Sequence, residues 1–582
     1  MIQRYLLRGV RASLPLLALC GVLASAVTAN ASSSSHEGAS NDLGEAIAEA
    51  LLGWLPDQLE TLGVPGAAVA VIGNREIVRQ EVYGVTGGPG SSPITPETIF
   101  CIRSISKSLT ALAVLMAVQD GLVDLDTPIS EYLPDLRLRS RFDEHPEDLM
   151  TLRHMLSHWA GFTHDPPVGI DLDQPGYFER YIERVPETWL RFPVGYRLEY
   201  SNYGLDLAGY ILQTRSGKPL ARYLQEKVLG PIGMVDSSFD LVSVEGATDR
   251  AIGHDGQGDA VPIRFPEIAA AGLYSSIRDM SRYAQFHLND GVVNGRRLLR
   301  EDLMEQAHSI QFARPGQRTG YCFGLWREPV GNTFSLYHEG GGRGFGSHMI
   351  LYPELGLGVV ALTNKEYQGL TGFAGRVIMN GPIINRYGPT PIADAGLDRM
   401  ERLDVEDPRL KPLLGRYGDS PGVVIGFESG VLGLRSSETS FLPLTFYDEG
   451  GELVGMYGST METRFLPPLG SRTGSMMTLS RTVSNSNSHY LDYNDSPLDP
   501  PGPARPEWQA YVGEYDVLWE DEPGSTATVE VRNGYLYLRD GKCEEHEPGL
   551  FSLYDGQTLD FRTSPLTFSY QEIKKQKCRT EP

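Results

Sequence analysis

The stretch CIRSISKSLT, residues 101–110, decides the fold of this chain. A strand-like run, TIFCI, leads into it, and the amphipathic run that starts at Ser104 predicts a helix that Gly121 ends. Ser104 and Lys107 stand three residues apart, and residues at this spacing share one face of a helix. We therefore expect the lysine amine to lie beside the serine hydroxyl.

A serine and a lysine in this arrangement are a candidate nucleophile and base. A serine hydroxyl is a poor nucleophile until a neighbouring base takes its proton. Lysine can serve as that base when burial and nearby positive charge lower its pKa. However, S-x-x-K occurs by chance about once in a chain of this length, so the pair alone also fits two polar residues at a solvated helix end.

Tyr200 and Asn202, in PVGYRLEYSNYG, form the second candidate group. A phenol close to an ammonium group is stabilised as phenolate, which gives a base for the Ser104 proton. An asparagine side chain both donates and accepts, so Asn202 suits an amide of the substrate. Taken alone, Y-x-N more often marks a loop with an aromatic plug, and Tyr203 competes for the same role.

His338, Gly340 and Gly341 form the third group, in HEGGG directly before two strand-like runs. Glycines in a strand let a substrate backbone approach closely, and a free N–H there can complete an oxyanion hole with the N–H of Ser104. H-x-G occurs twice more in the chain, each time in a loop-like context with no strand pair behind it. The context therefore selects His338.

The order S-x-x-K, Y-x-N, H-x-G resembles the penicillin-recognising serine hydrolases, a superfamily of class C β-lactamases, DD-peptidases, esterases and D-aminopeptidases. The resemblance covers residues from about 63 to 364 and extends to flanking stretches, namely GVPGAAVAV, FCIRSISKSLTA, TLRHMLSHWAGF, YSNYGLDLAGYIL, AAGLYSSIRDMSRYAQ and HEGGGRGFGSHMILYPELGLGVVALTN.

The resemblance implies a role for each motif residue. Ser104 would be the acylated nucleophile, with Lys107 and Tyr200 as the proton-transfer pair. Substrate would be bound by Asn202, His338, Gly340 and Gly341, and the Gly341 N–H would join the oxyanion hole. His338 departs from the lysine that β-lactamases usually keep at its position. A mostly neutral histidine offers less charge for a substrate carboxylate, which favours the peptidase and esterase branches. No metal or organic cofactor is implied.

The implied fold is α+β, with a β-lactamase/transpeptidase-like catalytic domain in which helices flank an antiparallel sheet beside an all-helical region. After about residue 400 the pattern changes to short alternating runs with Gly and Asp turns, typical of antiparallel sheet. Two portions of this tail look alike, with GRY and GVLGLR in the first and GEY and GYLYLR in the second. We expect two lipocalin-like β-barrel modules, as in D-aminopeptidases, with one continuous β domain as the alternative.

These patterns divide the chain into a signal peptide (1–31), a serine hydrolase domain (40–395), module 1 (406–481), a linker (482–506) and module 2 (507–580). The signal peptide is predicted from a basic start, a short apolar run and an A-x-A-like site, so we expect export to the periplasm or the medium. A formal charge of −23 argues against nucleic acid and anionic lipid as partners.

Cysteines and histidines outside the motifs suggest little chemistry. Cys543 and Cys578 could form a disulfide in an oxidising compartment, whereas Cys101 and Cys322 lie in apolar runs where a buried thiol is expected. A pair of histidines, residues 154 and 158, has a spacing that can bind zinc, but it lacks an obvious third ligand, so we predict no metal site.

The sequence thus predicts an exported serine hydrolase that cleaves small peptides or amides, including bonds beside D-residues, through an acyl-enzyme. Carboxylester or β-lactam hydrolysis is the alternative with the same chemistry. A binding protein that kept the fold without turnover is a third possibility, disfavoured because all three motifs are present.

Overall fold

The structure is a computed structural model of the 582-residue chain. It describes residues 36–88, 90–164, 176–313, 318–365, 400–417, 423–437, 440–449, 451–457, 461–466, 476–481, 490–495, 505–519, 522–532, 535–538, 541–553, 558–562, 566–568 and 571–575. The predicted signal peptide lies outside these residues.

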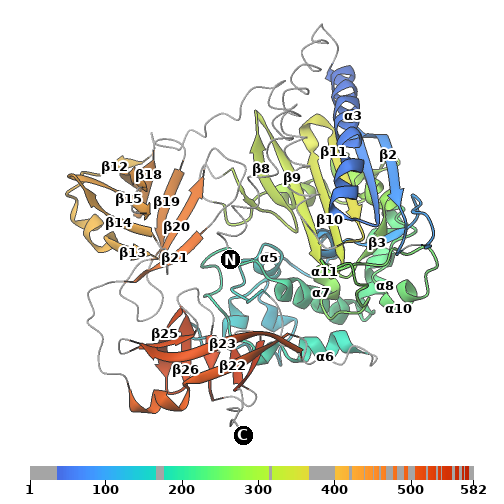
Figure 1. Ribbon diagram of the computed structural model, residues 1–582. Coiled ribbons are helices and arrows are strands. Elements are labelled where there is room, and N and C mark those ends of the chain that lie inside the picture. The colour runs from blue at the N-terminus through green and yellow to red at the C-terminus, as the bar shows by residue number, and fades with distance from the viewer. Residues whose placement is uncertain are drawn as a thin grey trace.

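A seven-stranded antiparallel sheet with the order β2-β1-β11-β10-β9-β8-β7 forms the base of the catalytic domain (Figure 1). Its strands are β1 (Gly66–Gly73), β2 (Glu76–Gly84), β7 (Gly320–Tyr321), β8 (Trp326–Val330), β9 (Thr333–Gly342), β10 (Phe345–Tyr352) and β11 (Leu357–Thr363). The two strand-like runs expected after HEGGG are confirmed as the paired strands β10 and β11.

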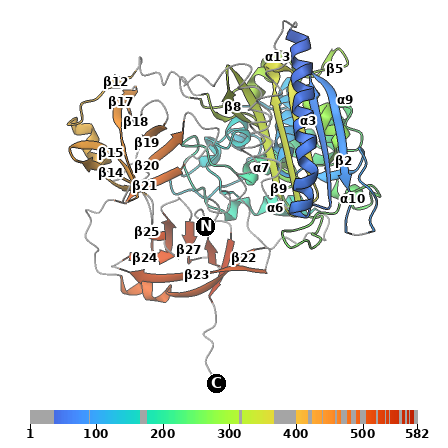
Figure 2. The same ribbon diagram turned by 45° about the horizontal axis from the view of Figure 1, so that its top comes forward.

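Each face of this sheet is covered by helices. The 27-residue helix α3 (His36–Leu62) lies along one face and packs its leucines on Val69 and Val71 of β1 (Figure 2). The intervening residues Ala68 and Ala70 point to the other face and join the main core. Alternate side chains of a strand point to opposite faces, so a fully buried β1 needs apolar residues at every position, as the sequence GAAVAVIG supplies.

The remaining helices build the helical region on the second face (Figure 1). They are α4 (Ser106–Gln119), α5 (Leu152–Leu156), α6 (Tyr177–Glu183), α7 (Asn202–Ser216), α8 (Leu220–Leu224), α9 (Gly230–Ile232), α10 (Leu241–Glu245), α11 (Ile268–Ala271), α12 (Ile277–Leu288) and α13 (Glu301–His308). Small two-stranded ladders pair β3 (Ile99–Cys101) with β4 (Tyr274–Ser276) and β5 (Val292–Val293) with β6 (Arg296–Arg297).

Helix α4 runs through the centre of this core, and 12 of its 14 residues are buried. The prediction of an amphipathic helix is therefore corrected. Its polar residues are buried too, and they are compensated by hydrogen bonds, such as the one that Ser108 Oγ donates to the carbonyl of Ile105. The alternative in which Ser104 and Lys107 are solvated residues at a helix end is excluded for Lys107, which is fully buried.

The tail forms two antiparallel modules, drawn in orange and red in Figure 1. In module 1 the strands follow the order β12-β17-β18-β19-β20-β21-β13-β14-β15-β16, which is an open sheet. They are β12 (Glu401–Arg402), β13 (Gly415–Tyr417), β14 (Val423–Glu428), β15 (Val431–Ser437), β16 (Ser440–Pro443), β17 (Thr445–Glu449), β18 (Glu452–Tyr457), β19 (Met461–Leu466), β20 (Met476–Arg481) and β21 (Tyr490–Asp495).

In module 2 the strands pair in sequence, and β29 pairs back with β22. They are β22 (Gly513–Trp519), β23 (Glu522–Arg532), β24 (Tyr535–Leu538), β25 (Gly541–Glu547), β26 (Leu550–Leu553), β27 (Thr558–Asp560), β28 (Leu566–Phe568) and β29 (Gln571–Lys575). Module 2 contacts the catalytic domain, because the guanidinium carbon of Arg562 lies 5.8 Å from the centre of the Trp189 ring.

Two expectations for the tail need correction. Two closed barrels were expected, but the described strands of module 1 leave edges at β12 and β16. The predicted linker at 482–506 contains β21, which pairs with both β13 and β20, so this Ser/Asn-rich stretch belongs partly to module 1. Composition suggested a linker there, but hydrogen bonds to neighbouring strands can order a polar segment that has little apolar surface of its own.

The structure describes three of the five cysteines. Cys101 and Cys322 are buried free thiols, as predicted. Cys543 is buried in β25, and its predicted partner Cys578 lies outside the described residues, so the disulfide stays a prediction. Among the residues that the structure describes, no helix combines the length and apolar character needed to span a bilayer.

Candidate active site

Ser104 lies at a sharp turn between a strand and a helix. Strand β3 ends at Cys101, the single 3-10 turn η3 (Arg103–Ile105) carries Ser104, and α4 begins at Ser106. Arg103 has a φ of 50°, in the left-handed region that bulky side chains rarely adopt. The backbone therefore adopts a strained conformation at Arg103, just before the nucleophile, and Ser104 lies in a 3-10 turn, whereas the sequence had predicted a regular helix from Ser104.

Lys107 lies one turn after Ser104 and reaches back to it. Its Nζ is 2.9 Å from Ser104 Oγ and donates a second hydrogen bond, of 3.0 Å, to the carbonyl oxygen of Ala270. A buried amine is costly unless it is hydrogen-bonded, and these two oxygens meet part of that cost. The predicted contact between amine and hydroxyl is therefore present.

The Tyr200 ring lies close to the same amine. Lys107 Nζ is 5.0 Å from the centre of the Tyr200 ring, so the structure brings Ser104, Lys107 and Tyr200 together as the motif reading requires. Tyr200 lies just before α7, whose start is fixed by Ser201. The Ser201 hydroxyl accepts from the N–H of Gly204 and donates to the carbonyl of Thr163.

Asn202 is the first residue of α7. Its backbone N–H donates to the carbonyl of His164 over 2.8 Å, and this bond ties the start of the helix to the segment before residue 165. Only the capping residue Ser201 separates Asn202 from Tyr200. The geometry at the start of α7 therefore fixes the backbone positions of both residues. The predicted role of the Asn202 side chain in binding substrate stays a prediction.

His158 packs between Tyr200 and a residue that the sequence analysis missed, Tyr321. Its ring centre lies 4.2 Å from that of Tyr200 and 4.4 Å from that of Tyr321. The Ser201 N–H donates to His158 Nδ1, so the proton of the neutral ring is on Nε2. Burial, together with the charge of Lys107, lowers the pKa of His158 well below its usual value. His158 is thus a neutral side chain that lines the site.

His338 is held in one tautomer from both sides. Its Nδ1 lies 2.6 Å from the carbonyl oxygen of Glu339, which can only accept, so Nδ1 carries the proton. Its Nε2 then accepts from the Tyr321 hydroxyl at 3.1 Å. Burial, aided by the charge of Lys107, lowers the pKa of His338 to about 3. Both ring nitrogens of a neutral His338 are therefore engaged by the protein.

Gly340 allows β9 to approach the nucleophile. A Cβ atom at this position would overlap the carbonyl oxygen of Ile102 and Ser347 Oγ, and would lie 2.9 Å from Arg103 Cβ. Ser347, opposite Gly340 on β10, donates to the same Ile102 carbonyl at 2.6 Å. Gly341 follows on the strand that packs against η3, so the structure brings the glycines and Ser104 to one place, as expected.

Strand β9 also extends beyond its partner on one side. Pairing with β8 runs from Thr333 to Tyr337, opposite Trp326, while pairing with β10 continues to Gly342. Among the described strands, β10 is the ladder partner of the backbone from residue 338 to residue 342. A strand edge next to a nucleophile can hydrogen-bond an extended acyl chain.

Tyr321 and His158 were missed as site residues, for different reasons. Tyr321 lies in the apolar run GYCFGLW, where it reads as a core aromatic, and it is in fact fully buried. His158 was considered only as a zinc ligand. Its partner in that spacing, His154, instead stacks on Phe312 with ring centres 4.7 Å apart. No group of three or more potential metal ligands occurs in the described part of the chain.

A family model described as Beta-lactamase matches residues 53–378, which is more than half of the chain and includes every site residue above. The chain belongs to the beta-lactamase family. Membership makes it a serine hydrolase, in agreement with the expected superfamily and with the Ser104–Lys107 contact.

Relatives of this family member carry different activities in their names. Esterase EstB from Burkholderia gladioli is 29% identical over 356 residues, which are 53% of this chain and 88% of the esterase. A beta-lactamase from Yersinia enterocolitica is 25% identical over 341 residues, 53% of this chain and 84% of that protein. The octameric penicillin-binding protein homologue from Pyrococcus abyssi superposes with a TM-score of 0.48 at 22% identity, over 76% of this chain and 99% of that one.

Proposed function

We propose that this beta-lactamase family member hydrolyses small peptides and amides through an acyl-enzyme on Ser104. The observation that carries the proposal is the 2.9 Å contact between Lys107 Nζ and Ser104 Oγ, with the Tyr200 ring 5.0 Å from the same nitrogen. A serine with an amine at this distance has a base in place to take its proton.

The reaction follows from these positions. Ser104 Oγ attacks the substrate carbonyl while its proton passes to the Tyr200 and Lys107 pair. That pair then protonates the leaving amine as the acyl bond breaks. Water attacks the acyl-enzyme and loses a proton to the same pair, which restores the Ser104 hydroxyl and releases the acid. The backbone N–H groups of Ser104 and Gly341 would stabilise the negative oxygen in both steps.

An amide or peptide substrate suits the edge of β9. This strand carries Gly340 and Gly341 beside Ser104, and an extended chain can bind along such a strand in the manner of an added strand. Substrates with a D-residue beside the scissile bond are part of the proposal. It is supported by the two antiparallel modules that follow the catalytic domain, although module 1 is an open sheet and not the closed barrel expected of D-aminopeptidases.

Carboxylester hydrolysis is the second candidate. The described side chains close to the Ser104–Lys107 pair include two histidines, His158 and His338, and burial lowers the pKa of both, so neither adds positive charge to the site at neutral pH. An uncharged acyl group suits such a site better than the carboxylate of a β-lactam does. The relative named Esterase EstB supports the same candidate.

A fluorophosphonate probe tests the chemistry shared by these candidates. The full chain should be labelled at Ser104, as mapped by mass spectrometry, and Ser104→Ala should abolish labelling. Ser216→Ala, at the end of α7, is the control that should label like the parent. Absence of labelling in a folded sample would leave the non-catalytic binding protein as the better reading.

Three substrates separate the candidates. D-Aminoacyl anilides report amide cleavage, short-chain nitrophenyl esters report ester cleavage, and nitrocefin reports β-lactam cleavage. We expect turnover of anilides, with esters also accepted because their leaving group is better. Rapid hydrolysis of nitrocefin without turnover of either other class would overturn the substrate assignment while leaving Ser104 as nucleophile.

We also propose that the enzyme is exported to the periplasm or the medium, on the sequence of residues 1–31. Cell fractionation and amino-terminal sequencing test this directly. The mature chain should be found outside the cytoplasm and should begin after Ala31.

A further inference from the structure

The segment that leads into Tyr200 runs along the stretch of chain that carries His158. It begins at Arg191, whose N–H donates to the carbonyl of Gly161 over 2.8 Å. It ends at Glu199, whose N–H donates to the carbonyl of His158 over 2.6 Å. The His158 ring in turn packs on the Tyr200 ring. The path of this segment therefore sets the point at which the backbone reaches Tyr200.

Side chains from the two ends of this segment meet in a buried group of three charges. Glu199 Oε1 accepts from Arg191 Nη1, and Glu199 Oε2 accepts from Arg197 Nη2 at 2.7 Å. Each of these side chains is at most 17% exposed. The guanidinium carbons of Arg197 and Arg191 also lie 4.1 and 5.5 Å from the centre of the Phe192 ring. We call Arg191, Arg197 and Glu199 the charge clamp.

Stability alone does not account for the charge clamp. Removing charges from water is costly, and a buried ion pair can often be replaced by apolar side chains of similar volume without loss of stability. What charged hydrogen bonds add is a fixed direction between donor and acceptor. Because both oxygens of one carboxylate are held by different arginines, the Glu199 side chain has little freedom to turn, and neither has the backbone that carries it.

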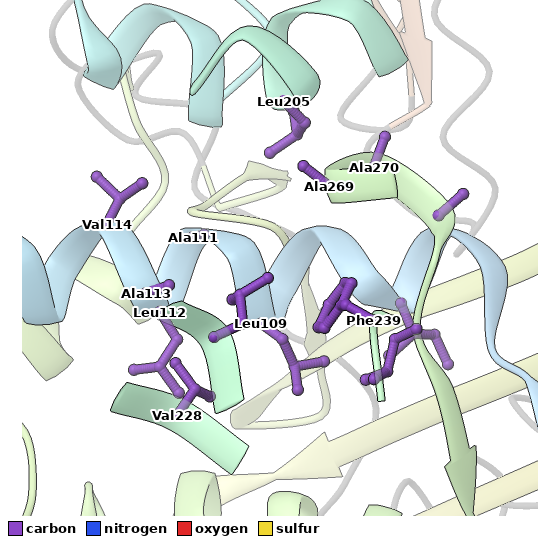
Figure 3. Packing of buried hydrophobic residues seen from close by; sticks show 14 of the residues in the cluster. Leu109, Ala111, Leu112, Ala113, Val114, Leu205, Val228, Phe239, Ala269 and Ala270 are labelled. Carbon is purple, nitrogen blue, oxygen red and sulfur yellow. The ribbon is translucent and has the colours of Figure 1, made fainter. Parts of the chain in front are cut away.

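Helix α7 holds Tyr200 from the other side. Ser201 caps the first turn of this helix, and Leu205 in its second turn is fully buried in the main core. Figure 3 shows Leu205 close to Ala269 of α11, with which α7 is packed. Tyr200 is therefore the residue between a helix that the core fixes and a segment that the charge clamp fixes.

We propose that Glu199 is a positioning residue for Tyr200. By holding the charge clamp together it fixes the backbone just before Tyr200, and so keeps the phenol ring 5.0 Å from Lys107 Nζ. Glu199 touches no reacting atom in this account and acts through Tyr200. The inference rests on the proposed function, in which Tyr200 and Lys107 accept the Ser104 proton.

Glu199→Gln in the full chain removes the charge and keeps the size of the side chain. The amide has one accepting oxygen, so it cannot hold both arginines, and the segment before Tyr200 should loosen. The assay measures fluorophosphonate labelling of Ser104 at increasing probe concentration, which gives the maximal rate and the half-saturating concentration separately. We expect the maximal rate to fall about tenfold, because a displaced base slows the chemical step. The half-saturating concentration should not change.

A double-mutant cycle with Tyr200→Phe separates positioning from general stability. Tyr200→Phe removes the phenol hydroxyl and should lower the maximal rate by about a hundredfold. In that background Glu199→Gln should cost no more than about twofold, because no hydroxyl is left to be misplaced. A residue that only stabilised the fold would lower the rate by the same factor in both backgrounds.

Asp236→Asn is the matched control. Asp236 is a carboxylate with 17% side-chain exposure that accepts from the guanidinium of Arg278, on α12, at 2.6 Å. Its loss should lower the midpoint of thermal unfolding and leave the labelling rate unchanged. If circular dichroism shows that Glu199→Gln does not fold, Arg197→Gln replaces it. That variant leaves Glu199 paired with Arg191, so a smaller loss of rate is expected, again only when Tyr200 is present.

Four outcomes would overturn the inference. They are an unchanged maximal rate in folded Glu199→Gln, an equal loss in the Tyr200→Phe background, an equal loss in Asp236→Asn, and labelling of Tyr200→Phe at the parent rate. Each of these leaves Ser104 as the nucleophile of the proposed function. If the parent chain itself is not labelled, the proposed function fails and this inference fails with it.

Discussion

Gly340→Ala should slow acylation of Ser104 by about a hundredfold without unfolding the protein. The added methyl group would overlap the Ile102 carbonyl and Ser347 Oγ, so β9 and the turn that carries Ser104 must separate by about 1 Å to reach ordinary contact distance. A displacement of this size at a reacting centre costs about 10²-fold in rate, or about 2.7 kcal/mol of activation free energy.

The same overlap should lower stability by about 1 to 3 kcal/mol, which is the usual cost of an extra methyl group in a packed region. The assay measures the fluorophosphonate labelling rate of Ser104 and the midpoint of thermal unfolding. Gly426→Ala is the matched control, because Gly426 also lies in a strand, β14, and the nearest atom to an added Cβ is 3.8 Å away.

Parent-like labelling by Gly340→Ala would refute this reasoning, because it would mean that close approach of β9 is not what positions Ser104. A large loss of Ser104 labelling in Gly426→Ala would also refute it. Replacing any strand glycine would then slow labelling, whether or not the added methyl group lies near Ser104. If Gly340→Ala lost stability but kept the parent labelling rate, the overlap would weaken packing without changing the position of Ser104.

Three further outcomes are expected. Tyr321→Phe removes the hydroxyl that donates to His338 Nε2 and leaves a buried acceptor without its partner, so denaturant unfolding should show a loss of about 1 to 3 kcal/mol. Burial lowers the folded-state pKa of His338 to about 3 and of His308 to about 4, so between these values and about 6.5 the unfolded chain binds more protons. Unfolding free energy should therefore fall as pH drops from about 7 to 4, by up to about 1.4 kcal/mol per pH unit for each histidine, and His308→Gln should reduce that slope. Finally, burial raises the pKa of Cys322 to about 12, so this thiol should react with a disulfide reagent only after denaturation, as mass mapping can show.

The motif residues could be predicted because local geometry determines their spacing. Three residues along one helical turn bring Lys107 back to Ser104, and this holds although the first turn is a 3-10 turn and not the start of a regular helix. Glycine at position 340 likewise indicates that another backbone segment approaches the strand closely. Strands often contain glycine beside a binding site for this reason.

The tail shows the limits of reasoning from composition. The alternating pattern predicted antiparallel strands, and the strands are present in both modules. Whether a sheet closes depends on hydrogen bonds between strands far apart in the chain, such as those between β22 and β29, and a local pattern does not encode them. For the same reason β21 lies in a stretch whose polar composition resembled a linker.

By itself the sequence determined the family, the order of the catalytic motifs and the elements that carry them, because each of these depends on neighbours along the chain. Only the tertiary structure decided what surrounds the motifs. Tyr321 contacts His338 from 17 residues away, and Asp206 meets Ala270 across 64 residues. In the sequence both residues look like parts of ordinary buried elements. Burial and long-range contacts set the charge of His338 and the surroundings of Lys107, and those contacts arise only when the sheet and the helical region pack together.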